Sequence, residues 1–294
     1  GRNFDITGAI NGDDAHSTVA HSHVLTEFAQ YVCDGLLGDG QSSTRYMHLA
    51  LSFYDNSGTE LTGANYPKIT QMHIGSAHTM DTTTNDFNDC NYFLSTEGKL
   101  YRFGYNSYGQ LGDGTTTQNY FNREMPMSLF GGEKIIYITG TGYQYGTMYA
   151  ITETGKLWGW GRNADGQLGL GNTTQQTTPQ HITGVSGSQL ENKKVVHLFA
   201  SQDGDDVTRC WVLTDEGVVY FMGQRESHGI RVGSYNSTSS TTQNTPIGLT
   251  NASTLWNSNN QKVIYMSISG GRYPVLHFIT DGGTTGHAQK IYAT

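Results

Sequence analysis

One segment of this chain occurs twice, and every glycine of the first copy has a glycine in the second. Residues 98–114 read GKLYRFGYNSYGQLGDG, and residues 155–171 read GKLWGWGRNADGQLGLG. Such self-similarity marks a repeat protein, in which each unit buries its apolar face against the next unit. Repeated units build extended binding surfaces more often than single catalytic pockets. The repeat therefore constrains the fold first and makes an enzyme a poor explanation of the chain.

Four units can be traced, and each opens with a lysine followed by a β-branched run. A second apolar strand, a polar hairpin that ends in glycine, and a third strand follow in each unit. Short strands between glycine turns, without a helical period, predict an all-β radial repeat with blades of three to four antiparallel strands. We place the units at residues 68–133, 134–193, 194–261 and, incompletely, 262–294, after a divergent segment of residues 1–67 that contains the tail of one repeat.

The glycines and aromatic residues of the repeats are expected to have structural roles. A tight turn needs a positive φ angle, which a β-carbon disfavours. The predicted structural glycines are Gly98, Gly104, Gly109, Gly112, Gly155, Gly161, Gly166 and Gly169. Between the blades we expect five buried aromatic side chains, namely Phe103, Trp158, Trp160, Trp211 and Tyr220.

Two heptapeptides connect these repeats to a known family. Residues 106–112 read NSYGQLG, and residues 163–169 read NADGQLG. Each heptapeptide resembles the most recognisable motif of the regulator of chromosome condensation repeat, whose units stack as blades of a β-propeller. The match is specific over residues 90–180, weaker over 190–294 and weakest before residue 68. The glycines of this motif are structural in the family, so the resemblance implies a fold and not an activity.

The two ends of the chain look like incomplete repeats. Residues 35–40 read GLLGDG and resemble the end of a unit, whereas the chain finishes inside what would be a third strand. The family usually forms seven blades, which at about 62 residues each would exceed this chain. We expect further polypeptide to complete a larger ring; a smaller ring or an open one is the alternative. If the two ends close one blade, residues 290–292 should pair with a strand within residues 1–34.

Composition excludes some functions and favours others. Charged residues make up 14% of the chain and the net charge is −8, so no basic stripe for nucleic-acid binding is present. No apolar run approaches the ~18 residues of a membrane span. The three cysteines, Cys33, Cys90 and Cys210, lack metal-binding spacing and are expected to be buried thiols. The sequence contains no motif for a catalytic nucleophile or for a nucleotide cofactor, so we predict neither a catalytic residue nor a cofactor.

Two kinds of candidate site remain. On a strand, His21 and His23 would project to one face near Asp14 and could ligate a divalent metal, although an exposed polar loop explains them better. Polar, uncharged loops between units carry aromatic rings and could recognise proteins or sugars; solvation of the connections is the plainer explanation. Their candidate binding residues are Tyr120, Phe121, Asn172, Thr173, Tyr235 and Asn236.

Three functions are consistent with these observations. We favour a non-enzymatic virion or cell-surface protein, such as a phage tail, fibre or capsid appendage. Its propeller loops would contact other copies of itself, other subunits or a host glycan. A secreted bacterial propeller that binds or inhibits another protein is the alternative. A guanine-nucleotide exchange regulator like the family's namesake is favoured least, because no basic tail is present. Fold analogy alone does not decide among them.

Overall fold

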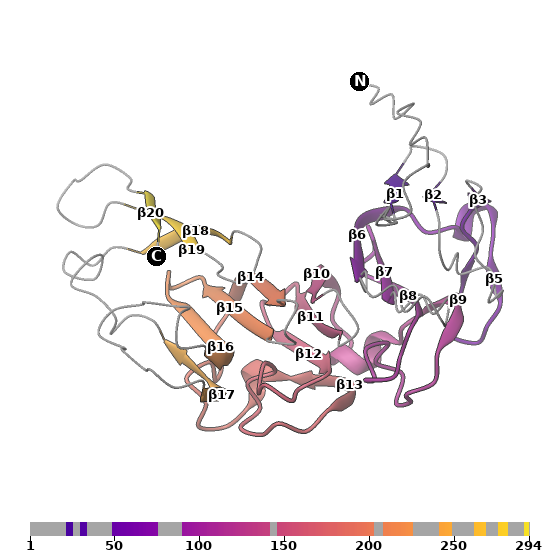
Figure 1. The fold of residues 1–294 in the computed structure, drawn as a ribbon. Helices are drawn as coiled ribbons and strands as arrows, with labels where there is room; N and C mark the ends of the chain where they lie inside the picture. Colours follow the sequence, from indigo (N-terminus) through magenta and orange to yellow (C-terminus); the bar gives the residue numbers. More distant parts are fainter. Residues whose placement is uncertain are drawn as a thin grey trace, which may run out of the picture.

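The computed structural model describes residues 22–25, 30–33, 49–75, 90–141, 146–202, 208–225, 241–248, 262–268, 276–281 and 291–293. The sheets follow one another in chain order around an arc (Figure 1). Within each of the three complete blades, consecutive strands pair antiparallel to give a four-stranded set. The architecture is the β-propeller that the repeats predict.

The three complete blades have the same strand order. Blade 1 contains β6 (Ile69–Gly75), β7 (Cys90–Ser95), β8 (Leu100–Gly104) and β9 (Asn119–Glu124). Blade 2 contains β10 (Ile135–Gly140), β11 (Thr147–Thr152), β12 (Leu157–Gly161) and β13 (Gln176–His181). Blade 3 contains β14 (Val195–Gln202), β15 (Thr208–Thr214), β16 (Val219–Arg225) and β17 (Thr241–Gly248). Blade 4 is represented by β18 (Val263–Ile268), β19 (Leu276–Thr280) and β20 (Ile291–Ala293).

The N-terminal region contributes to two sheets. The strands β1 (Ser22–Leu25), β2 (Gln30–Cys33) and β3 (Leu49–Ala50) form a sheet of their own. The strands β4 (Phe53–Tyr54) and β5 (Glu60–Leu61) extend blade 1, because β4 runs parallel to β9 with Tyr54 opposite Arg123. Among the described strands, β20 pairs with β19 alone, so β1 and β2 do not complete blade 4. Short 3₁₀ turns follow β5, β9 and β13, at η1 (Gly63–Asn65), η2 (Met127–Phe130) and η3 (Ile182–Gly184).

The outermost strand of each of the three complete blades follows or overlaps a segment that we expected to be a loop. Tyr120 and Phe121 lie in β9, and the polar runs after Asn172 and Asn236 lead into β13 and β17. The loop prediction was therefore wrong for Tyr120 and Phe121. Among the described strands, β13 and β17 pair on one side only, and β9 meets only the short β4 on its outer side. These strands bury few side chains, so their sequences lack the apolar alternation that marks a strand.

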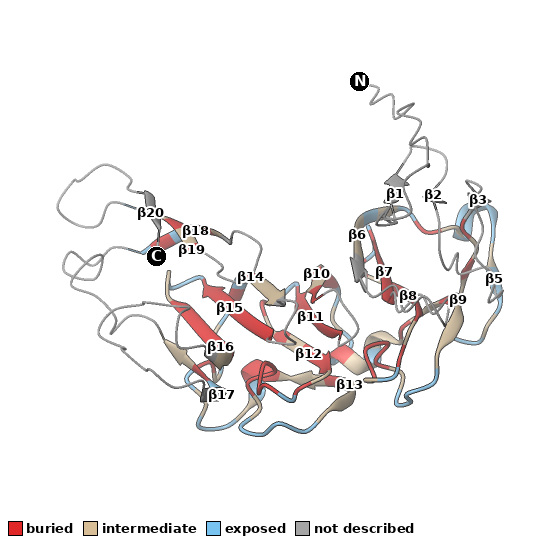
Figure 2. Cartoon of the chain, in the orientation of Figure 1, coloured by how far each residue is buried: buried red, intermediate tan, exposed pale blue. Residues whose placement is uncertain are grey.

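The core lies between blades and is densest around the middle strands (Figure 2). Phe103, Trp160, Trp211 and Tyr220 are buried, as predicted. Trp160 is fully buried, and its indole Nε1 donates to the Gln110 carbonyl of blade 1 at 2.9 Å. Trp158 is only half-buried, so that prediction was wrong. It shares a face with Trp160 but stacks on His181, its partner across the strand pair, with ring centres 4.8 Å apart.

Backbone hydrogen bonds connect each blade to the next at two places. The hairpin glycine of one blade accepts from the first residue of the next innermost strand: Ile135 N donates to Gly98 O at 3.1 Å, and Val195 N donates to Gly155 O at 2.8 Å. The long turn of one blade donates to the next outermost strand, from Gly114 N to Thr177 O at 2.8 Å. Gly171 N makes the equivalent bond to Asn244 O at 2.7 Å.

A buried asparagine shapes each long turn. Asn106 is fully buried; its Oδ1 accepts from Leu111 N, and its Nδ2 donates to the carbonyls of Thr115 and Thr117. The turn brings Gly109 against β13 with φ +70°, so a β-carbon there would lie 2.7 Å from the Thr177 Cα. Asn163 and Gly166 repeat this arrangement against β17. Glycine is required at these two positions both by φ and by the neighbouring backbone.

We expect the substitution Trp160→Ala to destabilise the fold by roughly 3–5 kcal/mol, the cost of removing a fully buried aromatic side chain. Trp160→Phe should cost less, because blade 1 itself holds Phe103 at the equivalent position. Trp158→Ala is the matched control and should cost less than Trp160→Ala, because that ring is half-exposed. Urea unfolding followed by circular dichroism measures the differences. Equal losses of stability in Trp158→Ala and Trp160→Ala would contradict this account of the core.

Burial of the imidazole Nε2 of His73 predicts a pH-dependent stability. This nitrogen has no hydrogen-bond partner in the described part of the chain, and burial lowers the pKa of His73 from 6.5 to about 4. The unfolded chain therefore binds this proton at a higher pH than the folded protein does. The free energy of unfolding should fall as the pH drops from 6.5 to 4, by as much as about 3 kcal/mol. Urea titrations over this range should show a shallower fall in His73→Gln; an unchanged slope would contradict the assignment.

Candidate protein-binding surface

Every innermost strand contains a β-bulge at its second residue. The pairing register shifts between Ile69 and Gln71, Ile135 and Tyr137, Val195 and His197, and Val263 and Tyr265. A bulge leaves one residue unpaired and turns its side chain away from the regular alternation. The bulged residues are Thr70, Ile136, Val196 and Ile264.

The bulges place large apolar side chains in solvent on three successive blades. Ile136 is 57% exposed, Val196 is 50% exposed and Ile264 is 49% exposed. Each is followed by a ring, in Tyr137, His197 and Tyr265. We call these six residues the bulge row. It runs along β10, β14 and β18, on the inner side of the arc of sheets (Figure 1).

The rings of the bulge row lie near one another across blades. The centres of the Tyr137 and His197 rings are 5.3 Å apart in a perpendicular arrangement, and those of His197 and Tyr265 are 6.5 Å apart. Burial lowers the pKa of His197, so its ring is neutral at pH 7, and burial raises the pKa of Tyr137. The row is thus uncharged, with exposed lysines beside it at Lys134, Lys194 and Lys262. An apolar centre with a charged rim is typical of a protein-binding surface.

The sequence did not predict the bulge row, although the signal was present. The lysine and β-branched run that opens each unit aligns Ile136, Val196 and Ile264. Two adjacent apolar residues in an edge strand cannot both face the core unless the strand is irregular. That conflict could have indicated one exposed residue in each unit.

Of the residues that the sequence predicted for binding, the four described ones lie in two different settings. Asn172 and Thr173 lie exposed in the turn before β13. Phe121 is 40% exposed on β9 and packs edge-to-face against Tyr54, whereas Tyr120 packs partly buried against the cluster around Phe53. Tyr235 and Asn236 lie outside the described residues.

The predicted metal site also lies largely outside the described part of the chain. Asp14 and His21 fall there, and His23 is placed only as a backbone position of β1, opposite Val32. Of the described side chains, no three His, Cys, Asp or Glu residues cluster in a way that could hold a metal ion. Cys90 and Cys210 are buried thiols outside any disulfide, as predicted.

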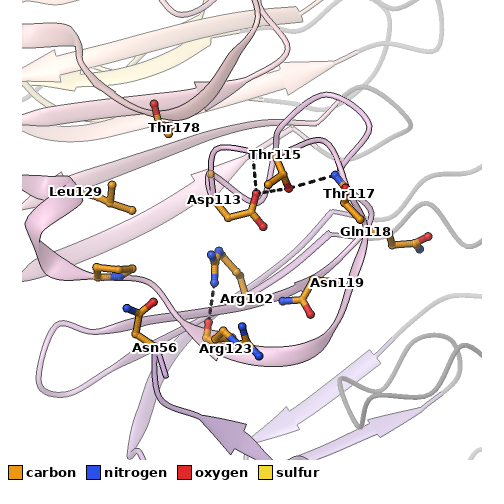
Figure 3. Close-up of a pocket in the computed structure, with 12 residues that line it drawn as sticks. Asn56, Arg102, Asp113, Thr115, Thr117, Gln118, Asn119, Arg123, Leu129 and Thr178 are labelled. Atoms are coloured by element: carbon orange, nitrogen blue, oxygen red, sulfur yellow. Dashed lines mark hydrogen bonds between the residues drawn. The ribbon is translucent and has the colours of Figure 1, made fainter. Parts of the chain in front are cut away.

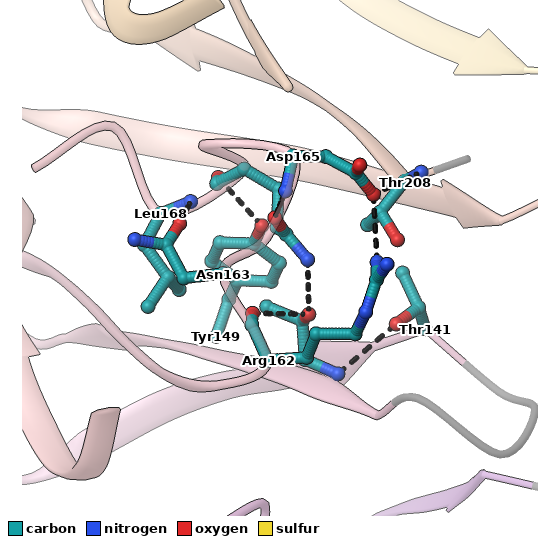
Figure 4. A network of polar contacts seen from close by, with 9 residues as sticks. Thr141, Tyr149, Arg162, Asn163, Asp165, Leu168 and Thr208 are labelled. Atoms are coloured by element: carbon teal, nitrogen blue, oxygen red, sulfur yellow. Dashed lines mark hydrogen bonds and ion pairs between the residues drawn. The ribbon is translucent and has the colours of Figure 1, made fainter. Parts of the chain in front are cut away.

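A dense polar network between blades 2 and 3 is structural in character (Figure 4). Arg162 Nη1 donates to Asp165 Oδ2 at 2.7 Å, and the amide of Thr208 on β15 donates to the same oxygen at 3.2 Å. The Gln167 side chain bonds to Asp165 N and to the Thr147 hydroxyl. Because the charged and amide groups of this network are bonded within the protein, they join the two blades.

The radial sheets, the blade-to-blade bonds and the exposed inner row together define a β-propeller built from repeats. The model of the regulator of chromosome condensation (RCC1) repeat matches residues 97–144 and 154–204, so these two segments are RCC1-type repeats. Each match starts in the hairpin of one blade and continues through the innermost strand of the next blade. The hydrogen bond to the hairpin glycine connects these two parts of the match.

Known proteins resemble parts of the chain. The human probable E3 ubiquitin-protein ligase HERC4 is 30% identical over 138 residues, which are 46% of this chain and 12% of that protein. The Arabidopsis thaliana ultraviolet-B receptor UVR8 is 28% identical over 133 residues, covering 43% of this chain and 26% of the receptor. The crystal structure of human WBSCR16 superposes with a TM-score of 0.58 at 16% identity, covering 93% of this chain and 59% of that one. The chain thus corresponds to a minor part of these two relatives, and the solved structure supports the fold.

Within the described residues, the structure contains no helix of the length and hydropathy that a membrane span requires.

Proposed function

We propose that this chain is a non-catalytic protein-binding propeller and that the bulge row is its contact surface. The observation that carries the proposal is the exposure of Ile136, Val196 and Ile264 at equivalent positions of three blades. Monomeric proteins rarely expose contiguous apolar groups without a partner to cover them.

The geometry suits a polypeptide better than a small molecule. The row spans three blades along one side of the arc, whereas a small-molecule site is concave and encloses its ligand. Tyr137 and Tyr265 add large rings with few rotatable bonds, the residue type that dominates binding energy at protein interfaces.

For the biological setting, we propose a component of a virion or of an extracellular surface. Composition supports this part of the proposal, because charged residues make up only 14% of the chain and Thr, Asn, Ser and Gly supply its polar surface. Fractionation of the native source tests it. Co-purification with particles or with a cell-surface fraction is expected, and recovery only as a free intracellular protein would contradict it.

Site-specific photo-cross-linking tests the contact surface. A photoreactive residue at position 196 should cross-link a polypeptide partner in the native source, and the same residue at position 172 should not. Position 172 is the control because Asn172 is exposed in a turn of the outer strands, among the loop residues that the sequence favoured. Cross-links from position 172 alone would place binding on those loops.

The paired substitution Ile136→Asp with Ile264→Asp should weaken partner binding at least about ten-fold, because it places charge at both ends of the apolar row. The free energy of unfolding should change by no more than about 1 kcal/mol, because both side chains are exposed. Affinity measured with the cross-linked partner after its identification, beside a urea unfolding curve, separates the two effects. Unchanged affinity in the folded double variant would contradict the proposal.

A further inference from the structure

A polar cavity of about 540 Å³ lies beside the outer strands of blade 1. Its lining comes from the turn at Asn56, the strands β8 and β9, the long turn that joins these two strands, the segment with Pro126 and Leu129, and Thr178 of blade 2. Figure 3 shows the Arg102 side chain among these residues, with Arg123, Asn56 and Asn119 around it. This cavity is separate from the bulge row, which lies on the innermost strands.

Two arginines face each other in the wall of the cavity. Arg102 on β8 and Arg123 on β9 are directly opposite in the antiparallel ladder. Arg102 is only 5% exposed. Like charges directly opposite on neighbouring strands destabilise a sheet, and the repulsion grows as the groups are withdrawn from water. A pair of this kind calls for a compensating negative charge.

Neither guanidinium forms an ion pair with a carboxylate of the described residues. Arg102 donates to two backbone carbonyls, from Nε to Leu111 O at 2.6 Å and from Nη1 to Arg123 O at 3.0 Å. The Nε of Arg123 is buried and has no partner in the described part of the chain. A buried guanidinium N–H without an acceptor is costly, so it indicates a missing acceptor at this point.

The nearby carboxylates are largely engaged by other groups. Oδ1 of Asp113, which lines the cavity, accepts from Asn106 Nδ2 and from the amide and hydroxyl of Thr115. Glu124 pairs with Lys99 at 3.3 Å. The Asp55 carboxylate accepts from Ser57 and from the Thr59 amide. The cavity therefore has two positive charges and one negative charge.

The fold does not require the arginine pair. In blade 2 the equivalent opposed residues are Gly159 and Gln180, and in blade 3 they are Phe221 and Ile247. Blades 2 and 3 retain the same strand pairing with uncharged residues in place of both arginines. The charge pair is thus particular to blade 1, which distinguishes it from the repeated scaffold.

We propose that this cavity is a binding site for a small oxyanion, a phosphate or a carboxylate. Arg123 supplies the free Nε donor and Arg102 supplies positive charge held in place by its two carbonyl contacts. The amides of Asn56, Gln118 and Asn119 supply neutral donors at the rim. Arginine is the side chain best suited to such a ligand, because its planar fork matches two oxygens.

Calorimetric titration of the full chain with inorganic phosphate, and separately with acetate, tests the site. Sodium chloride at equal ionic strength is the reference, because it screens charge without offering two oxygens. We expect saturable binding of phosphate or acetate, and the anion that binds more tightly identifies the class of ligand. Arg123→Gln, which installs the residue type that blade 2 has at this position, should weaken binding at least about ten-fold. Lys68→Gln, an equal change of charge at an exposed position outside the cavity lining, should leave binding unchanged.

Thermal unfolding separates a ligand site from a merely structural arginine. In low salt without oxyanion, Arg123→Gln should melt at the same temperature as the unsubstituted chain or higher, because it removes the opposed like charge. Oxyanion should raise the melting temperature of the unsubstituted chain more than that of the variant. Three results would overturn the proposal: phosphate and acetate acting no differently from chloride, binding unchanged in Arg123→Gln, or a variant that melts well below the unsubstituted chain without oxyanion.

Discussion

The hydrogen bond from the Gly114 amide to the Thr177 carbonyl joins the long turn of blade 1 to the outermost strand of blade 2. It forms because Gly109, in the same turn, lets the two backbones approach more closely than a β-carbon allows. The buried side-chain amide of Asn106 holds this turn in place. Gly166, Gly171 and Asn163 repeat the contact onto β17. The rest of the arrangement depends on this junction, since it sets how each blade lies against the next.

Because the junctions are equivalent, equivalent positions in successive blades can carry different side chains within one backbone frame. The opposed pair on the third and fourth strands is arginine with arginine in blade 1, glycine with glutamine in blade 2, and phenylalanine with isoleucine in blade 3. The bulge position shows the opposite behaviour, since it is aliphatic in three blades and threonine in blade 1. A position that changes with the blade provides a local site, and a position that repeats provides a continuous surface. The proposed oxyanion site and the bulge row follow from these two patterns.

The sequence predicted the parts of the fold that glycine and buried aromatic residues determine. Positive φ angles at Gly98 and Gly155, and the burial of Phe103 and Trp160, were readable because few residue types satisfy those demands. The outermost strands could not be predicted from the sequence, because their backbones pair in a sheet while their polar side chains show no strand pattern. Trp158 was assigned to the core from the alignment of the repeat copies, which does not report how far each position is covered. The arginine site was missed because it depends on which residues become neighbours across strands, as Arg102 and Arg123 do. The bulge row was missed because its sign in the sequence is only a pair of adjacent apolar residues at the start of a strand.

Residue-resolved native-state hydrogen exchange tests the junction most directly. Gly114 and Gly171 lie in exposed turns, yet their amides donate to the next blade. The account predicts that both amides exchange about a thousand-fold more slowly than the amide of exposed Thr116 in the same turn as Gly114, and that they open together with the strands of the following blade. Exchange of Gly114 and Gly171 at the rate of Thr116 would show that the turns are not bound to the neighbouring blades and would contradict the account.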